Sequence, residues 1–120
     1  MERSMKKMPD CLFCKIIAGQ IPSQKVYEDE YCYAFRDIAP QAPTHILVVS
    51  KAHVANIAEA ATLPDAALAA IIRAIGQIAK AEKMNNGFRI VSNCGKDACQ
   101  SVGHWHVRIL GGKQLSERMD

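Results

Sequence analysis

The chain has 120 residues, of which 49% are hydrophobic, and a formal net charge of +3. This length and apolar content suffice for one domain with a hydrophobic core, and they argue against a disordered chain. The net charge is small and no basic run extends beyond Lys6-Lys7, so nothing indicates nucleic-acid binding, whereas a small anionic ligand is compatible with it.

The sequence also limits the compartment. No apolar run approaches the roughly 18 residues of a membrane span, and residues 1–7 lack the apolar core of a secretory signal. We therefore expect a cytoplasmic protein that does not bind membranes. Cys11-Leu12-Phe13-Cys14 contains two of the five cysteines, and in a reducing compartment this spacing indicates metal or redox chemistry rather than disulfides.

The first half of the chain predicts a short helix and three strands. Residues 1–9 are expected to form a disordered or extended tail, and Pro9-Asp10 to provide the N-cap of a helix over residues 11–19. Strands over residues 25–27 and 31–36 predict a hairpin, because a short charged turn separates them. Two prolines place residues 37–43 in a loop, and residues 45–49 follow as an apolar central strand.

The second half predicts one long helix and two further strands. A short helical piece over residues 54–60 is followed by Thr62-Leu63-Pro64-Asp65, which has the spacing of a capping box. Asn85-Asn86-Gly87 predicts a turn, residues 88–92 a strand and residues 93–99 a polar loop. Apolar residues recur at intervals of three and four until about Met84 and predict a core-facing helix: Leu68, Ile71, Ile72, Ile75, Ile78 and Ala79.

Polar and apolar side chains alternate from His104 to Ile109, as in a strand with one face on a core and the other on a site. Alternate side chains of a strand are roughly 6.6 Å apart, so we expect His104 and His106 to point the same way and share a pocket. The elements together predict an α+β fold. It has an antiparallel sheet of about five strands, one long helix and a short N-terminal helix, in a single domain over residues 1–120.

The Cys-x-x-Cys pair is a candidate metal site. Cys11 and Cys14 have the spacing at which two thiolates chelate one zinc ion, and a closed tetrahedral site needs two further ligands. His53 and His104 are the candidates for these ligands. The alternative is two buried thiols and two surface imidazoles with no metal. A thioredoxin-like redox pair is less favoured, because the chain lacks the βαβ pattern that accompanies it.

His106 is a candidate nucleophile. A neutral imidazole with one free nitrogen can attack phosphorus when a hydrogen bond at the other nitrogen fixes its tautomer. The preceding loop offers donors for a phosphate from Asn93, Gly95, Gln100 and Ser101. The alternatives are an ordinary hydrogen-bonded strand histidine and a surface loop of the usual polar composition.

These features are combined in a chain that resembles histidine-triad (HIT) proteins, specifically the Hint branch of purine nucleoside phosphoramidases. The family's signature on the last strand is His-φ-His-φ-His-φ-φ, where φ is apolar. The resemblance spans nearly the whole chain through these segments, in the same order: Cys11-Leu12-Phe13-Cys14-Lys15-Ile16-Ile17, Ile21-Pro22, Tyr27-Glu28-Asp29, Ala34-Phe35-Arg36-Asp37-Ile38, Pro40-Gln41-Ala42-Pro43-Thr44-His45, Lys51-Ala52-His53 and Cys99-Gln100-Ser101-Val102.

The resemblance implies the HIT fold and a hydrolase that acts in two steps. His106 matches the histidine that attacks the α-phosphorus of a nucleotide ester or amide, and water then releases the nucleotide. The substrates implied are nucleoside 5′-phosphoramidates or acyl nucleotides, and the ligand is a purine nucleotide such as AMP or GMP. The resemblance also implies a homodimer joined through the long helix and neighbouring strands, with the segment after Gly112 near the partner's site.

It implies, in addition, roles for most of the polar residues noted above. Asp37 matches the acid that binds the ribose hydroxyls, and His45 a buried histidine behind the site. In metal-containing relatives the positions of Cys11, Cys14, His53 and His104 hold a structural zinc ion. The phosphate cradle corresponds to Asn93, Gln100, Ser101 and the backbone at Val102. The apolar slot for the purine, whose alternative is ordinary core packing, corresponds to Leu12, Phe13, Ile16, Phe35 and Ile38.

One position departs from the signature, because Arg108 replaces the third histidine. In the family this side chain assists the leaving group. Arginine stays protonated at any working pH, so it donates hydrogen bonds to phosphate but does not hand over a proton. General-acid assistance is worth about 10²–10⁴-fold. We therefore expect nucleotide binding with weakened turnover, or turnover limited to leaving groups that need little protonation. The alternative function is a non-catalytic nucleotide-binding or regulatory module.

Overall fold

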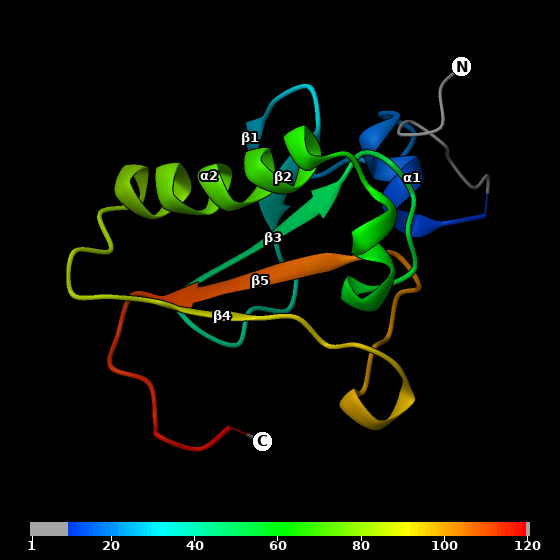
Figure 1. The fold of residues 1–120 in the computed structure, drawn as a ribbon. Helices are drawn as coiled ribbons and strands as arrows, with labels where there is room; N and C mark the ends of the chain where they lie inside the picture. Colours follow the sequence, from blue (N-terminus) through cyan, green and yellow to red (C-terminus); the bar gives the residue numbers. More distant parts are fainter. Residues whose placement is uncertain (1–9, 120) are drawn as a thin grey trace.

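The structure is a computed structural model that describes residues 10–119, so the expected tail over residues 1–9 lies outside the described part (Figure 1). Five antiparallel strands form one sheet in the order β1-β2-β3-β5-β4, which confirms the predicted α+β class. The elements are α1 (Leu12–Ile17), β1 (Lys25–Glu28), β2 (Cys32–Arg36), β3 (Thr44–Ser50), η2 (Ile57–Thr62), α2 (Asp65–Ala81), β4 (Arg89–Val91), η3 (Lys96–Ala98) and β5 (His106–Gly111).

The long helix α2 covers one face of the sheet and forms the main core with it (Figure 1). Its inner side is buried through small and branched residues, among them Ile71, Ala74 and Ile78. Side chains of a strand alternate between the two faces, so every second residue of the central strands contacts this helix. The strand residues in this core are Cys32, Ala34, Ile46, Val48, Val107 and Ile109.

The short helix α1 packs on the opposite face and forms a second, smaller cluster. Phe13 and Ile16 of α1 pack there against the strand residues of the other alternation: Tyr33, Phe35, Leu47 and Val49. In the sheet register, Val49 pairs with His106 and Leu47 pairs with Arg108. Because paired residues point to the same face, His106 and Arg108 project to the α1 side of the sheet. The polar residues of the last strand thus lie on the same face of the sheet as this smaller apolar cluster.

The last strand begins two residues later than expected. The alternation predicts a strand from His104, whereas β5 starts at His106. The reason is that the backbone N–H groups of the two preceding residues donate to loops: His104 to the Val102 oxygen at 2.9 Å and Trp105 to the Val54 oxygen at 2.8 Å. The side chains of these two residues still alternate, since Trp105 belongs to the α2-side core and His104 is buried outside that core.

Both predicted helix N-caps are wrong. Helix α1 is capped by Cys11, whose Sγ lies 3.5 Å from the N–H of Cys14, and not by Asp10, while Pro9 lies outside the described residues. Helix α2 has Pro64 at its N-cap position, without a side-chain hydrogen bond, so the capping box at 62–65 does not form. Thr62 is not available for it, because it ends the 3₁₀ helix η2 and its hydroxyl donates to the Glu59 oxygen at 2.8 Å.

Other element boundaries differ in detail. The helical piece expected over residues 54–60 is η2, which starts at Ile57 because Asn56 caps it through a side-chain oxygen that accepts from the Glu59 N–H at 3.1 Å. Helix α1 is shorter than residues 11–19, since Gly19 adopts φ +79°, which ends a helix. Ile72 was expected in the core but is 66% exposed, because it lies outside the buried side of α2.

Within residues 10–119, no helix combines the length and the hydropathy that crossing a bilayer would require.

Candidate active site

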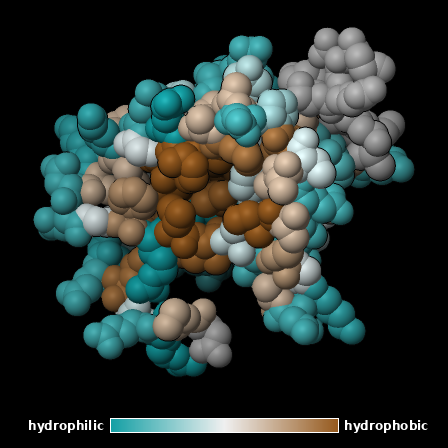
Figure 2. Space-filling view, viewed as in Figure 1, coloured by the Kyte–Doolittle hydropathy of each residue, from teal (hydrophilic) through white to brown (hydrophobic). Residues whose placement is uncertain are grey.

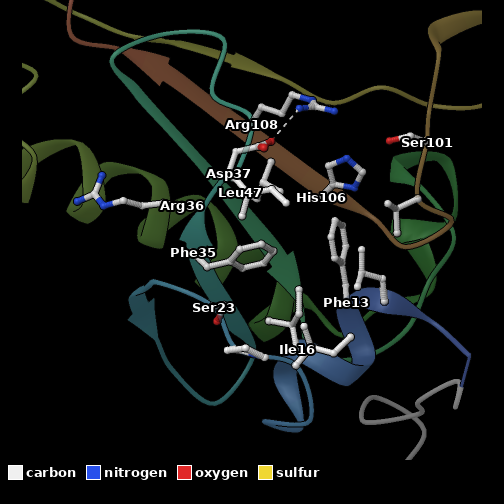
Figure 3. A pocket seen from close by; sticks show the side chains of 15 residues that line it. Phe13, Ile16, Ser23, Phe35, Arg36, Asp37, Leu47, Ser101, His106 and Arg108 are labelled. Atoms are coloured by element: carbon white, nitrogen blue, oxygen red, sulfur yellow. Dashed lines mark hydrogen bonds and ion pairs between the residues drawn. The ribbon is translucent and has the colours of Figure 1, made fainter.

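A cavity of about 270 Å³ opens on the α1 side of the sheet (Figure 3). Its walls are mostly apolar, and its polar side chains are Ser23, Arg36, Asp37, Ser101, His106 and Arg108. Ten of the twelve predicted catalytic and nucleotide-binding residues line it: Leu12, Phe13, Ile16, Phe35, Asp37, Ile38, Ser101, Val102, His106 and Arg108.

Five further residues line the cavity without having been predicted: Ile21, Pro22, Ser23, Arg36 and Leu47. A signal existed for Leu47, because the period of two in its strand places it on the same face as Val49. The segment 21–23 follows α1 and has no periodic pattern, so its place beside the cavity depends on how the chain folds back after Gly19.

His106 is held as a neutral imidazole with a free nitrogen. Its Nδ1 lies 2.7 Å from the backbone oxygen of His104. A carbonyl oxygen only accepts, so Nδ1 carries the proton and Nε2 carries the lone pair. The ring is 3% exposed, and burial lowers the pKa of His106, with the charge of Arg108 adding to this, while the hydrogen bond to His104 and the charge of Asp37 oppose it. The His106 side chain is thus neutral with a lone pair on Nε2, which is the form that a nucleophile needs.

The ring of Phe13 supports this arrangement from α1. Its centroid lies 5.1 Å from that of His106 and 5.8 Å from that of His104, both in edge-on geometry. Phe13 is buried and also contacts Phe35 at 5.7 Å. Because one aromatic side chain contacts both histidines, helix α1 fixes the position of the two rings together.

Arg108 lines the same cavity, next to Asp37 (Figure 3). Its Nε donates to Oδ1 of Asn93 at 3.2 Å, and its Nη1 donates to Oδ2 of Asp37 at 3.4 Å. Among residues 10–119, no side chain or carbonyl accepts a hydrogen bond from Nη2. The guanidinium group is therefore anchored through two of its nitrogens, and the third is available to a ligand.

His45 lies next to Asp37 and Arg108. Its Nδ1 accepts a hydrogen bond from the N–H of Gln41 at 2.9 Å, so the proton of the neutral ring is on Nε2. This Nε2 lies 3.4 Å from Oδ2 of Asp37 and 3.3 Å from Nη1 of Arg108. Two donors do not bond to each other, so Oδ2 of Asp37 is the acceptor that both approach. Burial lowers the pKa of His45, the charge of Arg108 adds to this and Asp37 opposes it.

Asp37 is consequently shared among protein groups. Its Oδ1 accepts from the N–H of Ala39 at 2.8 Å, and its Oδ2 accepts from Nη1 of Arg108 and lies 3.4 Å from Nε2 of His45. A carboxylate has about four acceptor positions, of which two hold hydrogen bonds here and a third lies beside Nε2 of His45. The expected contact of Asp37 with ribose hydroxyls stays a prediction, with about one acceptor position left for it.

Two predicted phosphate ligands do not line the cavity. Gln100 accepts from the Gly95 N–H at 2.8 Å and donates to the backbone oxygens of Ala55 and Val102 at 2.7 and 2.9 Å. Asn93 donates to the Ala98 oxygen at 2.8 Å and accepts from Arg108. Their side chains hold the loop between β4 and β5 in shape, which places Ser101 and Val102 at the cavity.

Next to the cavity, the four predicted metal ligands come together. The ligand atoms of Cys11, Cys14, His53 and His104 lie within 4.8 Å of one another. Nδ1 of His104 lies 3.3 Å from Sγ of Cys11 and 3.6 Å from Sγ of Cys14. Sγ of Cys14 in turn lies 3.5 Å from Nδ1 of His53. A tetrahedral zinc ion with its usual bond lengths of about 2.0–2.3 Å places its ligand atoms about 3.3–3.8 Å apart.

The protonation of His104 also suits a metal. Its Nε2 lies 2.7 Å from the backbone oxygen of Ser50, to which it donates, so the lone pair is on Nδ1 and faces the two thiols. Burial lowers the pKa of His104 to about 4, which keeps the ring neutral. The donor set fits a closed Cys₂His₂ site.

Comparison with known proteins identifies the family. A sequence model of the HIT domain matches residues 18–115. The chain belongs to the HIT family. This confirms the resemblance at the level of the family, and the HIT fold is shared with solved structures over most of their length.

Three HIT relatives illustrate the similarity. The chain is 42% identical to a 14 kDa zinc-binding protein of Zea mays and covers 93% of it with 96% of its own residues. A HIT family hydrolase from Clostridium thermocellum has a TM-score of 0.85 and 35% identity, with 94% of this chain and 99% of that one covered. A histidine triad nucleotide-binding protein from Candida albicans has a TM-score of 0.77 and 32% identity, with 92% and 87% covered.

Proposed function

We propose that this HIT protein is a purine nucleotide-binding hydrolase that cleaves nucleoside 5′-phosphoramidates or acyl nucleotides. The observation that carries the proposal is the hydrogen bond from Nδ1 of His106 to the His104 oxygen, which leaves Nε2 with its lone pair in a ligand-sized cavity. The names of the relatives from Clostridium thermocellum and Candida albicans, a hydrolase and a nucleotide-binding protein, support it.

In this mechanism the purine enters the apolar part of the cavity, between α1 and β2. The slot is the one predicted from Leu12, Phe13, Ile16, Phe35 and Ile38, all of which line it, with Ile38 fully exposed to solvent. The α-phosphate then lies near His106, whose Nε2 attacks phosphorus and forms a nucleotidyl-histidine. Water hydrolyses this intermediate in a second step. Ser101 and the backbone at Val102 are the remaining predicted phosphate ligands that line the cavity.

A second function is favoured by one observation. Arg108 stands where the family signature has its third histidine, the residue that would protonate the leaving group, and a guanidinium does not hand over a proton. A protein that binds nucleotides without turning them over, as a regulatory module, would have the same cavity. Binding alone therefore does not distinguish the two functions.

Two measurements on the wild-type protein and Arg108→His separate them. Calorimetric titration with AMP reports binding, and a steady-state assay with an acyl adenylate reports turnover. The hydrolase proposal expects AMP release, and mass spectrometry after an alkaline quench should find the nucleotidyl group on His106. Binding of AMP with no turnover in either protein would discard the hydrolase in favour of the binding module.

We also propose that Cys11, Cys14, His53 and His104 hold a structural zinc ion. Three of the distances between their ligand atoms, at 3.3, 3.5 and 3.6 Å, and the tautomer of His104 fit such an ion. With four protein ligands the site is closed, so the metal stabilises the fold and takes no part in the hydrolysis. The name of the relative from Zea mays, a zinc-binding protein, agrees with this.

A homodimer is the third part of the proposal. Figure 2 shows apolar side chains gathered on one face of the molecule, between α2 and β4. Three large apolar residues of this region are exposed: Ile72 (66%) on α2, Ile90 (49%) on β4 and Phe88 (42%) just before β4. Strand β4 is an edge strand, and the resemblance implies a dimer joined through these elements. A second copy covering this face would bury all three residues.

A further inference from the structure

The substitution at position 108 bears on which substrates react. We infer that Arg108 makes the site selective for nucleotide anhydrides, whose leaving group departs as an oxyanion, and selective against phosphoramidates. The oxyanion is a carboxylate from an acyl nucleotide or a phosphate from a nucleoside diphosphate. This inference rests on the proposed function, because it assumes attack by His106.

The first step is the position of Arg108 relative to the nucleophile. Both residues belong to β5 and are two positions apart, so their side chains leave the strand on the same face, roughly 6.6 Å apart. Both line the cavity, and Figure 3 shows them with Asp37 around its polar end. A phosphorus atom within reach of His106 Nε2 therefore has a guanidinium group as its neighbour.

The second step is that the guanidinium of Arg108 is held by hydrogen bonds from two of its nitrogens, while the third nitrogen has no hydrogen-bond acceptor among the described residues. Asn93 and Asp37 accept hydrogen bonds from Nε and Nη1 at 3.2 and 3.4 Å, which orient the planar group. The contact with Asp37 is long for a charge-assisted hydrogen bond, which is typically about 2.7–2.9 Å, so Asp37 compensates the positive charge only in part. With Nη2 available, the group can donate to an oxyanion without being displaced.

The third step is that the cavity lacks a group to protonate a leaving amine. Arg108 and Arg36 are permanent cations, and Arg36 donates to Glu82 at 2.9 Å. Nδ1 of His106 donates to the His104 oxygen, and both carboxylate oxygens of Asp37 accept hydrogen bonds, one from the Ala39 N–H and one from Nη1 of Arg108. Among the described residues that line the cavity, no ionisable side chain is left as a general acid.

The chemistry of the two bond types then decides the preference. Nε2 of His106 uses its lone pair to form a P–N bond, and the bond from phosphorus to the leaving group breaks with its electron pair on the departing atom. An anhydride releases a carboxylate or phosphate that is stable as an anion near pH 7 and is stabilised by Arg108. A phosphoramidate would release an amide anion unless its nitrogen is protonated. In the second step the oxygen of a water molecule bonds to phosphorus and its proton goes to solvent. The P–N bond breaks and its electron pair returns to Nε2 of His106.

The experiment measures kcat/KM of wild type, Arg108→His and Arg108→Gln on three adenosine compounds. These are an acyl adenylate, ADP and an adenosine 5′-phosphoramidate with a primary amine as leaving group. Each substrate is compared with itself across the variants, because intrinsic reactivities differ. The relative rates on the acyl adenylate and ADP distinguish carboxylate from phosphate as the preferred oxyanion. AMP titration and circular dichroism verify that each variant is folded.

We expect Arg108→His to raise turnover of the phosphoramidate by about 10²-fold or more, since histidine supplies the missing proton. Arg108→Gln keeps a polar side chain without charge, and should lower turnover of the anhydrides at least about tenfold without helping the phosphoramidate. Phosphoramidate turnover that does not rise in Arg108→His, or anhydride turnover that is unchanged in Arg108→Gln, would overturn the inference and leave the proposed function intact. If no protein turned over any compound or carried the nucleotidyl group on His106, both would be discarded.

Discussion

The backbone oxygen of His104 accepts a hydrogen bond from Nδ1 of His106 at 2.7 Å, while the side chain of His104 belongs to the Cys₂His₂ cluster. One residue thus connects the proposed metal site to the proposed nucleophile. Because an ion bound to Nδ1 of His104 would fix that residue, it would also fix the acceptor that sets the tautomer of His106. We therefore predict that loss of the metal disturbs the tautomer and position of His106.

Replacement of the nucleophile tests the mechanism most directly. In His106→Ala we expect turnover of an acyl adenylate to fall by at least about 10³-fold, because no other group forms the covalent intermediate. AMP binding should persist, since the apolar slot is unchanged. Turnover is measured by AMP release and binding by calorimetry. A variant that keeps wild-type turnover would show that His106 is not the attacking group.

The cluster of cysteines and histidines is tested by metal content. Elemental analysis of the dialysed protein should find one zinc ion per chain, and Cys14→Ser should lose it. We expect the variant to unfold about 5 °C or more below wild type, because metal binding contributes to folding.

Cys99→Ser is the matched control for this substitution, since Cys99 is an exposed cysteine in the loop before β5 and lies outside the cluster. It should keep its zinc and its unfolding temperature. A wild-type protein free of metal would instead indicate that the four side chains form an ordinary hydrogen-bonded cluster.

His45 should make the stability depend on pH. Burial lowers its pKa in the folded state, whereas in the unfolded chain histidine titrates near 6.5. Below about pH 6.5 the unfolded state therefore binds more protons, so the free energy of unfolding falls as the pH is lowered towards the folded-state pKa. In His45→Gln this contribution is absent. Urea unfolding at several pH values should give a shallower decrease for the variant, and parallel curves would contradict the assignment.

The apolar face between α2 and β4 predicts the oligomeric state. We expect wild type to sediment as a dimer and Ile90→Asp as a monomer, since a charge on the edge strand would be desolvated in the interface. Ile57→Asp is the control, because Ile57 is comparably exposed at 47% but lies on η2. A wild-type monomer, or equal effects of the two substitutions, would argue against this interface.

The strand pattern shows why much of the site could be predicted. Alternation in β5 is a local property of the backbone, and it places His106 and Arg108 on one face whatever the rest of the chain does. The Cys-x-x-Cys spacing is equally local. Boundaries were less predictable, since Trp105 donates to Val54, a residue far away in the sequence, and so delays the start of the strand.

By itself, the sequence determined the α+β class, the apolar stripe of the long helix and the residue types available for chemistry, because these follow from periodicity and spacing along the chain. Only the tertiary structure decided how those residues are used. It directs Gln100 and Asn93 to hold the loop rather than line the cavity, and it pairs Arg108 with Asp37, 71 residues away. Hydrogen-bond partners between distant segments depend on packing in three dimensions, and a one-dimensional pattern does not contain that information.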